Sequence, residues 1–207
     1  MKVVNLLAQV DAEKCIGCKT CERVCPVLAV KIVDRVAVVD EERCRGCAAC
    51  EQRCPQYAVT MVKRAEPLVV KVDLEGLDYK EIASLCRKAN FNPEQIICYC
   101  TATRAEEVAA AILRGAKTPE EISLVTGVRT GCKVECIQPV LRLLRAAGIN
   151  PEPPAKGWQW YGITVTAWEV PAEVKEKHGK RGFYFDEDIK VLDQVVATAT
   201  SEERSDS

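Results

Sequence analysis

Eight cysteines near the start of the chain form two runs of identical spacing, and the second run lies 29 residues after the first. In each run the gaps are two, two and three residues, and a proline follows the last cysteine. Thiolates are soft metal ligands, and short gaps on a tight loop turn successive sulfur atoms to one side. The pattern therefore predicts thiolate-held metal centres. The residues are Cys15, Cys18, Cys21 and Cys25 in the first run and Cys44, Cys47, Cys50 and Cys54 in the second.

The two runs, C-x2-C-x2-C-x3-C-P, resemble those of two-cluster bacterial-type ferredoxins. This resemblance implies two 4Fe-4S clusters, with the last cysteine of each run serving the other cluster. One cluster would be held by Cys15, Cys18, Cys21 and Cys54, and the other by Cys44, Cys47, Cys50 and Cys25. Structural zinc and disulfides are the two other interpretations of these cysteines. Structural zinc sites do not use a third cysteine at this spacing, and disulfides need an oxidising compartment.

The composition is that of an intracellular metalloprotein. The chain has 207 residues, 13 cysteines and a net charge of -1, so we expect no attraction to nucleic acid. No apolar stretch approaches the ~18 residues of a membrane span, and residues 1–10 lack the pattern of a secretory leader. We therefore expect a cytoplasmic location and protein partners. With His178 as the one histidine and no carboxylate pair, we expect no catalytic site of its own.

The repeat extends beyond the cysteines and predicts an α+β ferredoxin domain over residues 1–65. Val10-Asp11 corresponds to Val39-Asp40, and Ala29-Val30 corresponds to Ala58-Val59. Each half reads as a strand, a cysteine loop, a helical turn and a second strand. Val30–Val33 and Val36–Val39 are expected to form a hairpin around Asp34-Arg35.

Residues 66–150 are expected to be helical. Capping patterns open helices at Asp78, Thr103 and Thr118, and Gly127 closes the third of these helices. A fourth helix is expected from about Cys136 to Ala147. Cys86 shares an apolar helix face and is expected to be a buried core residue rather than a ligand.

This segment holds a second cysteine pattern, Cys98-Tyr-Cys100 and Cys132-Lys-Val-Glu-Cys136, separated by 31 residues. Together with Thr126-Gly-Val-Arg-Thr-Gly-Cys132, it resembles the bacterioferritin-associated ferredoxin domain, which recurs in nitrite reductases, copper chaperones and flavin-dependent amino-acid dehydrogenases. The resemblance implies a small all-α fold with one 2Fe-2S cluster on Cys98, Cys100, Cys132 and Cys136. The last pair is C-x3-C, whereas the family has C-x2-C, and zinc or no metal stays open as an alternative.

Residues 151–207 follow a proline-rich linker and are rich in aromatic residues. Seven of the eleven aromatic residues lie here: Trp158, Trp160, Tyr161, Trp168, Phe183, Tyr184 and Phe185. One interpretation is that residues 163–170 form a strand and that the rings make a small local core, but about 50 residues leave little room for one. The rings are expected either to cover the helical domain or to dock on another subunit, and the tail from Thr198 has the composition of disorder.

Three metal centres without substrate-processing residues predict an electron relay. We interpret the chain as an electron-transfer iron-sulfur subunit of a multi-subunit oxidoreductase, working between a catalytic subunit and a soluble carrier. The resemblance to flavin-dependent dehydrogenases implies a flavoprotein partner. A metal-trafficking protein and a redox sensor are the alternatives.

Overall fold

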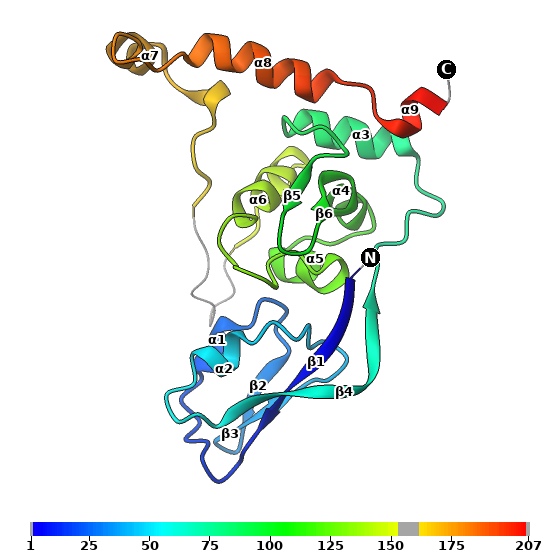
Figure 1. Cartoon of the computed structure of the whole chain (residues 1–207), viewed down its shortest axis with the longest axis vertical. Coiled ribbons are helices and arrows are strands. Elements are labelled where there is room, and N and C mark those ends of the chain that lie inside the picture. The colour runs from blue at the N-terminus through cyan, green and yellow to red at the C-terminus, as the bar shows by residue number, and fades with distance from the viewer. Residues whose placement is uncertain (1, 153–161, 206–207) are drawn as a thin grey trace.

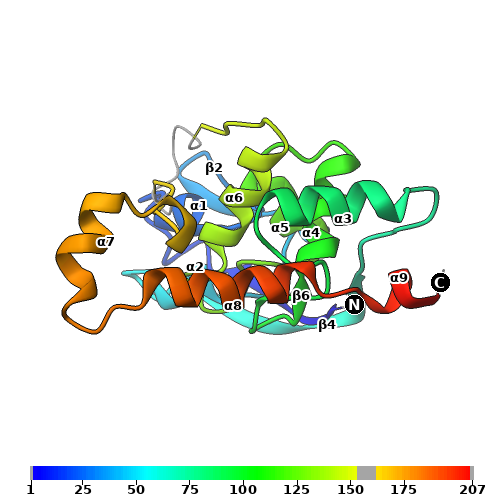
Figure 2. The same ribbon diagram turned by 90° about the horizontal axis from the view of Figure 1, so that it is seen from above.

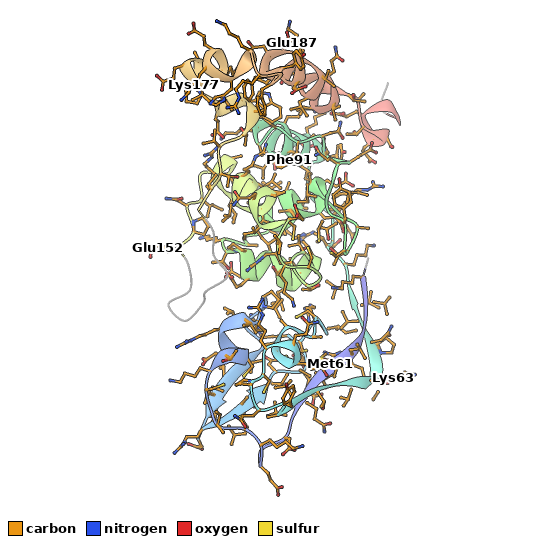
Figure 3. All side chains as sticks on the ribbon, turned by 60° about the vertical axis from the view of Figure 1, so that its left-hand side comes forward. Met61, Lys63, Phe91, Glu152, Lys177 and Glu187 are labelled. Atoms are coloured by element: carbon orange, nitrogen blue, oxygen red, sulfur yellow. The ribbon has the colours of Figure 1, made fainter. Side chains whose placement is uncertain are left out.

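The computed structural model describes residues 2–152 and 162–205. A sheet-containing part, a helical part and a C-terminal helical segment follow one another along the long axis (Figure 1). In Figure 3 the labelled Met61 and Lys63 lie in the sheet-containing part, Phe91 in the helical part, and Lys177 and Glu187 at the far end. Mixed helix and sheet agrees with the predicted α+β class.

Two antiparallel strand pairs build the first part. Strand β1 (Lys2–Val10) pairs with β4 (Val59–Val70), and β2 (Val30–Val33) pairs with β3 (Val36–Val39). The predicted hairpin is confirmed, because Asp34 and Arg35 both have left-handed backbone with φ of 47° and 66°. That combination closes a two-residue turn that matches the strand twist.

The sequence repeat is also a structural repeat. Val10 pairs with Val59, and Val39 pairs with Val30. Two short helices, α1 (Thr20–Val24) and α2 (Ala49–Gln52), each follow a left-handed residue. The core of this part is made of small apolar residues and cysteines: Ala8, Cys21, Val27, Ala29, Val30, Ala37, Cys44, Cys50 and Val59.

The helical part contains α3 (Tyr79–Lys88), α4 (Ala105–Leu113), α5 (Pro119–Thr126) and α6 (Ile137–Ala146). Asp78 caps α3 by accepting from the Lys80 N–H at 2.9 Å. Thr118 and Glu121 form the predicted capping box of α5, which ends at Gly127. Cys86 is completely buried in the core between these helices, as predicted.

Two details of this part differ from the sequence-based expectation. An all-α domain is not confirmed, because β5 (Ile96–Cys98) and β6 (Thr103–Arg104) pair as short strands. Helix α4 is capped at Arg104, whose N–H donates to Glu107 at 2.9 Å, rather than at Thr103. Thr103 lies in β6, and its hydroxyl is 2.7 Å from that of Thr101.

The C-terminal segment packs against the helical part. It contains the short 3-10 helix η1 (Ala167–Glu169), α7 (Ala172–Gly179), α8 (Phe185–Ala197) and α9 (Ser201–Ser205). Figures 1 and 2 show α8 running alongside the helical part. Asn92 fixes the end of α8 by donating to the carbonyl oxygens of Val195 and Thr198 at 3.1 and 2.8 Å.

The structure differs from two of the interpretations given for this segment. Residues 163–170 form no strand, because Thr166 caps η1 through the Glu169 carboxylate. The tail is ordered as far as it is described: Thr200 is buried, and Glu203 of α9 pairs with Arg87 at 2.7 Å. Trp158, Trp160 and Tyr161 lie outside the described residues, and a docking role for the segment stays a prediction.

In the described ranges, none of the helices combines the length and apolar character needed to cross a bilayer.

Candidate iron-sulfur sites

The structure gathers the cysteines of the first site around one small apolar cavity. Cys15, Cys18 and Cys21 reach it from the first run, and Cys54 reaches it from the second. Ile16, Ile32, Ala37 and Val59 are among the apolar residues that line the rest of the cavity. The residues brought together are therefore those that the crossed arrangement predicts for one cluster.

Backbone geometry explains the glycine inside this loop. Gly17 has φ of +67°, and a Cβ atom there would lie 2.5 Å from the carbonyl oxygen of Arg35. The loop therefore rests directly on the β2–β3 turn. Lys19 then takes the left-handed conformation, and α1 begins at Thr20. This sharp reversal carries Cys21 back toward Cys15 and Cys18.

The second site combines Cys25 with the second run. Burial raises the pKa of the Cys25 thiol, and the nearby thiols of Cys47 and Cys44 raise it further. Burial likewise raises the pKa of Cys50 to about 12, with Cys47, Cys25 and Cys44 adding to the shift. Clustered, buried thiols resist ionisation unless a cation compensates the negative charge. A thiolate-bound metal centre supplies that compensation.

Backbone N–H groups point at the sulfur atoms of both sites. Ala29 donates to Cys25 Sγ at 3.1 Å, and Ala58 donates to Cys54 Sγ at 3.2 Å. In the first site, Ala37 also donates to Cys15 Sγ at 3.4 Å. Such bonds favour the thiolate form and stabilise the added charge of a reduced cluster. The four-thiol groupings and their N–H donors fit 4Fe-4S clusters.

The third site draws its cysteines from two loops of the helical part. Cys98 ends β5 and Cys136 precedes α6, while Cys132 lies in the loop before it. The N–H of Cys132 lies 3.4 Å from Cys100 Sγ. Cys132 and Cys136 do not share a helix, so the extra residue of the C-x3-C pair is accommodated in the loop.

The thiols of the third site act on one another in two pairs. A hydrogen bond from Cys136 lowers the pKa of Cys98 to about 5, and the same bond raises the pKa of Cys136. The pKa of Cys132 is lowered by the N–H groups of Val134 and Glu135 and by the Cys100 thiol. Four converging thiols, partly favoured as thiolates, fit the ligand set of a 2Fe-2S cluster.

One face of the third site is open to solvent. Cys98 and Cys136 are buried, whereas Cys100 and Cys132 are exposed. Gly131 allows Cys100 to approach, because a Cβ atom at Gly131 would lie 2.3 Å from Cys100 Cβ. A group held here would therefore be close to the protein surface.

In the ranges covered by the structure, no cluster of three or more His, Cys, Asp and Glu side chains is gathered as ligands of a single metal ion. None of the thirteen cysteines, all of which are described, is in a disulfide.

Sequence reasoning missed the buried ion pair of Arg129 and Glu120 beside the third site. Arg129, buried beside the third site, pairs with the buried Glu120 at 3.1 Å. Its own N–H is among the groups that lower the pKa of Cys98. A charged residue inside the run Gly127-Val-Arg-Thr-Gly131 was the available signal.

The two cysteine-bearing parts contact each other directly. Arg45, between Cys44 and Cys47, donates from Nε to the carbonyl oxygen of Leu124 in α5 at 2.9 Å. The Leu124 side chain packs against the core of the first part. Lys2 Nζ donates to Thr130 Oγ1, beside the third site. The second and third sites therefore flank one interface.

Two known domain families match the chain. A 4Fe-4S dicluster domain matches residues 14–59, and a BFD-like 2Fe-2S binding domain matches residues 96–146. No curated protein and no solved structure matches. The order of the two families along the chain is the predicted one. The chain thus carries a 4Fe-4S dicluster domain followed by a BFD-like 2Fe-2S binding domain, and its cofactors are two 4Fe-4S clusters and one 2Fe-2S cluster.

Proposed function

We propose that this chain is the electron-transfer iron-sulfur subunit of a multi-subunit oxidoreductase. It relays electrons between a flavin-containing catalytic subunit and a soluble carrier. The observation that carries the proposal is the direct contact between the two cluster-binding domains through Arg45 and Leu124. Electron relay needs redox sites in series at short range, and a packed domain interface provides that arrangement.

The proposed ligands fall into three sets. The first set is Cys15, Cys18, Cys21 and Cys54, the second set is Cys25, Cys44, Cys47 and Cys50, and the third set is Cys98, Cys100, Cys132 and Cys136. Bound clusters supply one-electron oxidation and reduction. The protein holds the thiolates, shields them with small apolar residues and directs N–H groups at their sulfur atoms.

Exposure at both ends supports a relay between two partners. In the first set Cys18 is exposed, and in the third set Cys100 and Cys132 are exposed. Tyr99, between two ligands of the third set, is 82% exposed. A partner docking at either end could bring its own redox group close to a cluster, and in the proposed relay the second set connects the first set to the third.

The first test is a count of metal and electrons in the anaerobically purified chain. We expect about ten iron atoms with matching sulfide, and uptake of about three electrons in a reductive titration. As a matched control, a chain with Cys100→Ser and Cys132→Ser should keep about eight irons and take up about two electrons. Eight irons and one zinc in the unaltered chain would instead assign zinc to the third set.

The second test identifies the partner. The tagged chain is purified anaerobically from its own cells, and the copurifying proteins are analysed for flavin. A stoichiometric flavoprotein that reduces or oxidises the bound chain is the expected result. Transfer of iron or copper to a storage or transport protein would favour metal trafficking, and a regulatory partner that binds only one cluster state would favour sensing.

A further inference from the structure

Besides Arg45, a second cation, Lys2, reaches across the interface between the two domains. Lys2 lies at the start of β1 and belongs to the dicluster half by its pairing with Val70. Its ammonium donates to Thr130 Oγ1 of the other domain. Its stem passes close to Gly127, because a Cβ atom added to that glycine would lie 2.8 Å from Lys2 Cδ. The side chain is therefore inserted beside the loop that leads into Cys132.

Cysteines of both domains interact electrostatically with this ammonium. Burial lowers the pKa of Lys2, whereas the thiols of Cys47, Cys98 and Cys100 act in the opposite direction and raise it. The three thiols belong to the second and third sets. The main contributions to the pKa of Lys2 come from burial, from these three thiols and from Arg45, which lowers it, and none of them comes from a cysteine of the first set.

The packing around Lys2 explains this selectivity. Arg64 donates to the carbonyl oxygens of Leu6 on β1 and of Cys44, at 3.3 and 2.8 Å, and so ties the second run to the strand that carries Lys2. Arg45 ties the same run to α5. The first set instead lies beside β2 and β3, which are further from α5 than the start of β1 is (Figure 1).

We propose that the second set is the neighbour of the third set in the relay, that the first set is the terminal site, and that Lys2 is a positioning residue whose charge acts on the two neighbouring sites at once. This order deepens the relay proposed above and rests on it. In each transfer one electron leaves one site, which is oxidised, and enters the next, which is reduced; no bond is made or broken.

A fixed positive charge beside two sites favours the reduced state of both, since each gains one negative charge on reduction. Lys2 thereby raises both potentials in the same direction, so its charge changes the difference between them less than it changes either one. Removing the charge should lower both potentials and leave that of the first set unchanged. Lys2 acts here as a constant charge and not as a titrating group.

The test is a redox titration of the whole chain followed by electron paramagnetic resonance. Lys2→Met should make reduction of the second and third sites about tenfold less favourable, which is about 59 mV for a one-electron couple. Lys2→Arg keeps the charge and should stay near the unaltered values. Lys31→Met removes an exposed lysine of β2 and should change neither site. Unchanged potentials in Lys2→Met, or a shift of the first site as large as that of the second, would overturn the assignment.

A second measurement decides the order without altering Lys2. In the unaltered, fully reduced chain, the 2Fe-2S signal should be broadened by magnetic coupling to its neighbour. Cys47→Ser should remove that broadening, and Cys18→Ser should leave it in place; the reverse pattern refutes the order. Both measurements use the isolated chain, so failure to find an oxidoreductase partner would count against the proposed function alone. Iron is counted before the titration, because a count below ten would show that a cluster is missing.

Discussion

Arg45 donates a hydrogen bond from its guanidinium Nε to the carbonyl oxygen of Leu124, 2.9 Å away and 79 residues further along the chain. The same guanidinium donates from Nη1 to the carbonyl oxygens of Glu42 and Arg43 at 2.6 and 3.0 Å. One side chain therefore braces the cysteine loop of the second set and holds the adjoining domain against it.

The first prediction concerns this brace. Arg45→Met keeps the apolar stem and removes the donors, so we expect the domain contact to weaken by about 1 kcal/mol, the usual net value of such bonds. Hydrogen exchange should become faster in α5 and in residues 42–47, while all three clusters remain bound. Arg181→Met, in the C-terminal segment, is the control. Unchanged exchange in α5 would show that Arg45 does not hold the interface.

The second prediction separates the cluster sites. Cys54→Ser should damage the cluster that also uses Cys15, Cys18 and Cys21, because Cys54 faces their cavity. Cys132→Ser should spare both 4Fe-4S clusters and remove the 2Fe-2S signal. Iron analysis and electron paramagnetic resonance measure both outcomes. Loss of a 4Fe-4S signal in Cys132→Ser would contradict the division into separate cluster domains.

Features set by local sequence were predicted well. The Asp34-Arg35 turn, the Thr118 capping box and the Gly127 helix end depend on residues within a few positions of one another, and each is present in the structure. Grouping of the cysteines followed from spacing and from resemblance to known families. These patterns specify backbone conformation or ligand geometry directly.

The domain contact was beyond sequence reasoning. Lys2 and Thr130 are 128 residues apart. Thr130 lies in the run that ends at Cys132, but nothing in that run indicates Lys2 as its partner. Such pairs depend on how two finished domains pack, which hydrophobic periodicity does not encode. The tail was mistaken for disorder for a similar reason: its polar composition is typical of disorder, yet Glu203 finds a partner in Arg87 on another helix.

The third prediction tests the buried thiol that lies outside the cluster sites. Cys86 is fully buried, and burial raises the pKa of its thiol to about 12. Cys86→Ser places a more strongly polar group in this apolar core, and we expect a loss of about 1–3 kcal/mol of unfolding free energy. Cys86→Ala should cost less, since it leaves only a small void. Both variants should keep a full iron count, and missing iron would make Cys86 a ligand.

The fourth prediction is a pH dependence of the C-terminal helix α9. The hydrogen bond from Arg87 lowers the pKa of the Glu203 carboxyl from its usual 4.5 to about 2. Because the folded pKa is depressed, the stabilisation is fully present above pH 4.5 and is lost as the pH falls through about 2. The pair is partly exposed, so its contribution is below about 1 kcal/mol.

Because acid would also disrupt the clusters, the charge of Glu203 is best removed by substitution and measured at neutral pH. Glu203→Gln should speed hydrogen exchange in residues 198–205 and leave the exchange of α4 and α5 unchanged. Lys177→Gln, on the far helix α7, serves as the matched surface control. Exchange in the tail that is equally fast in the unaltered chain and in Glu203→Gln would mean that the ion pair does not anchor α9 to α3.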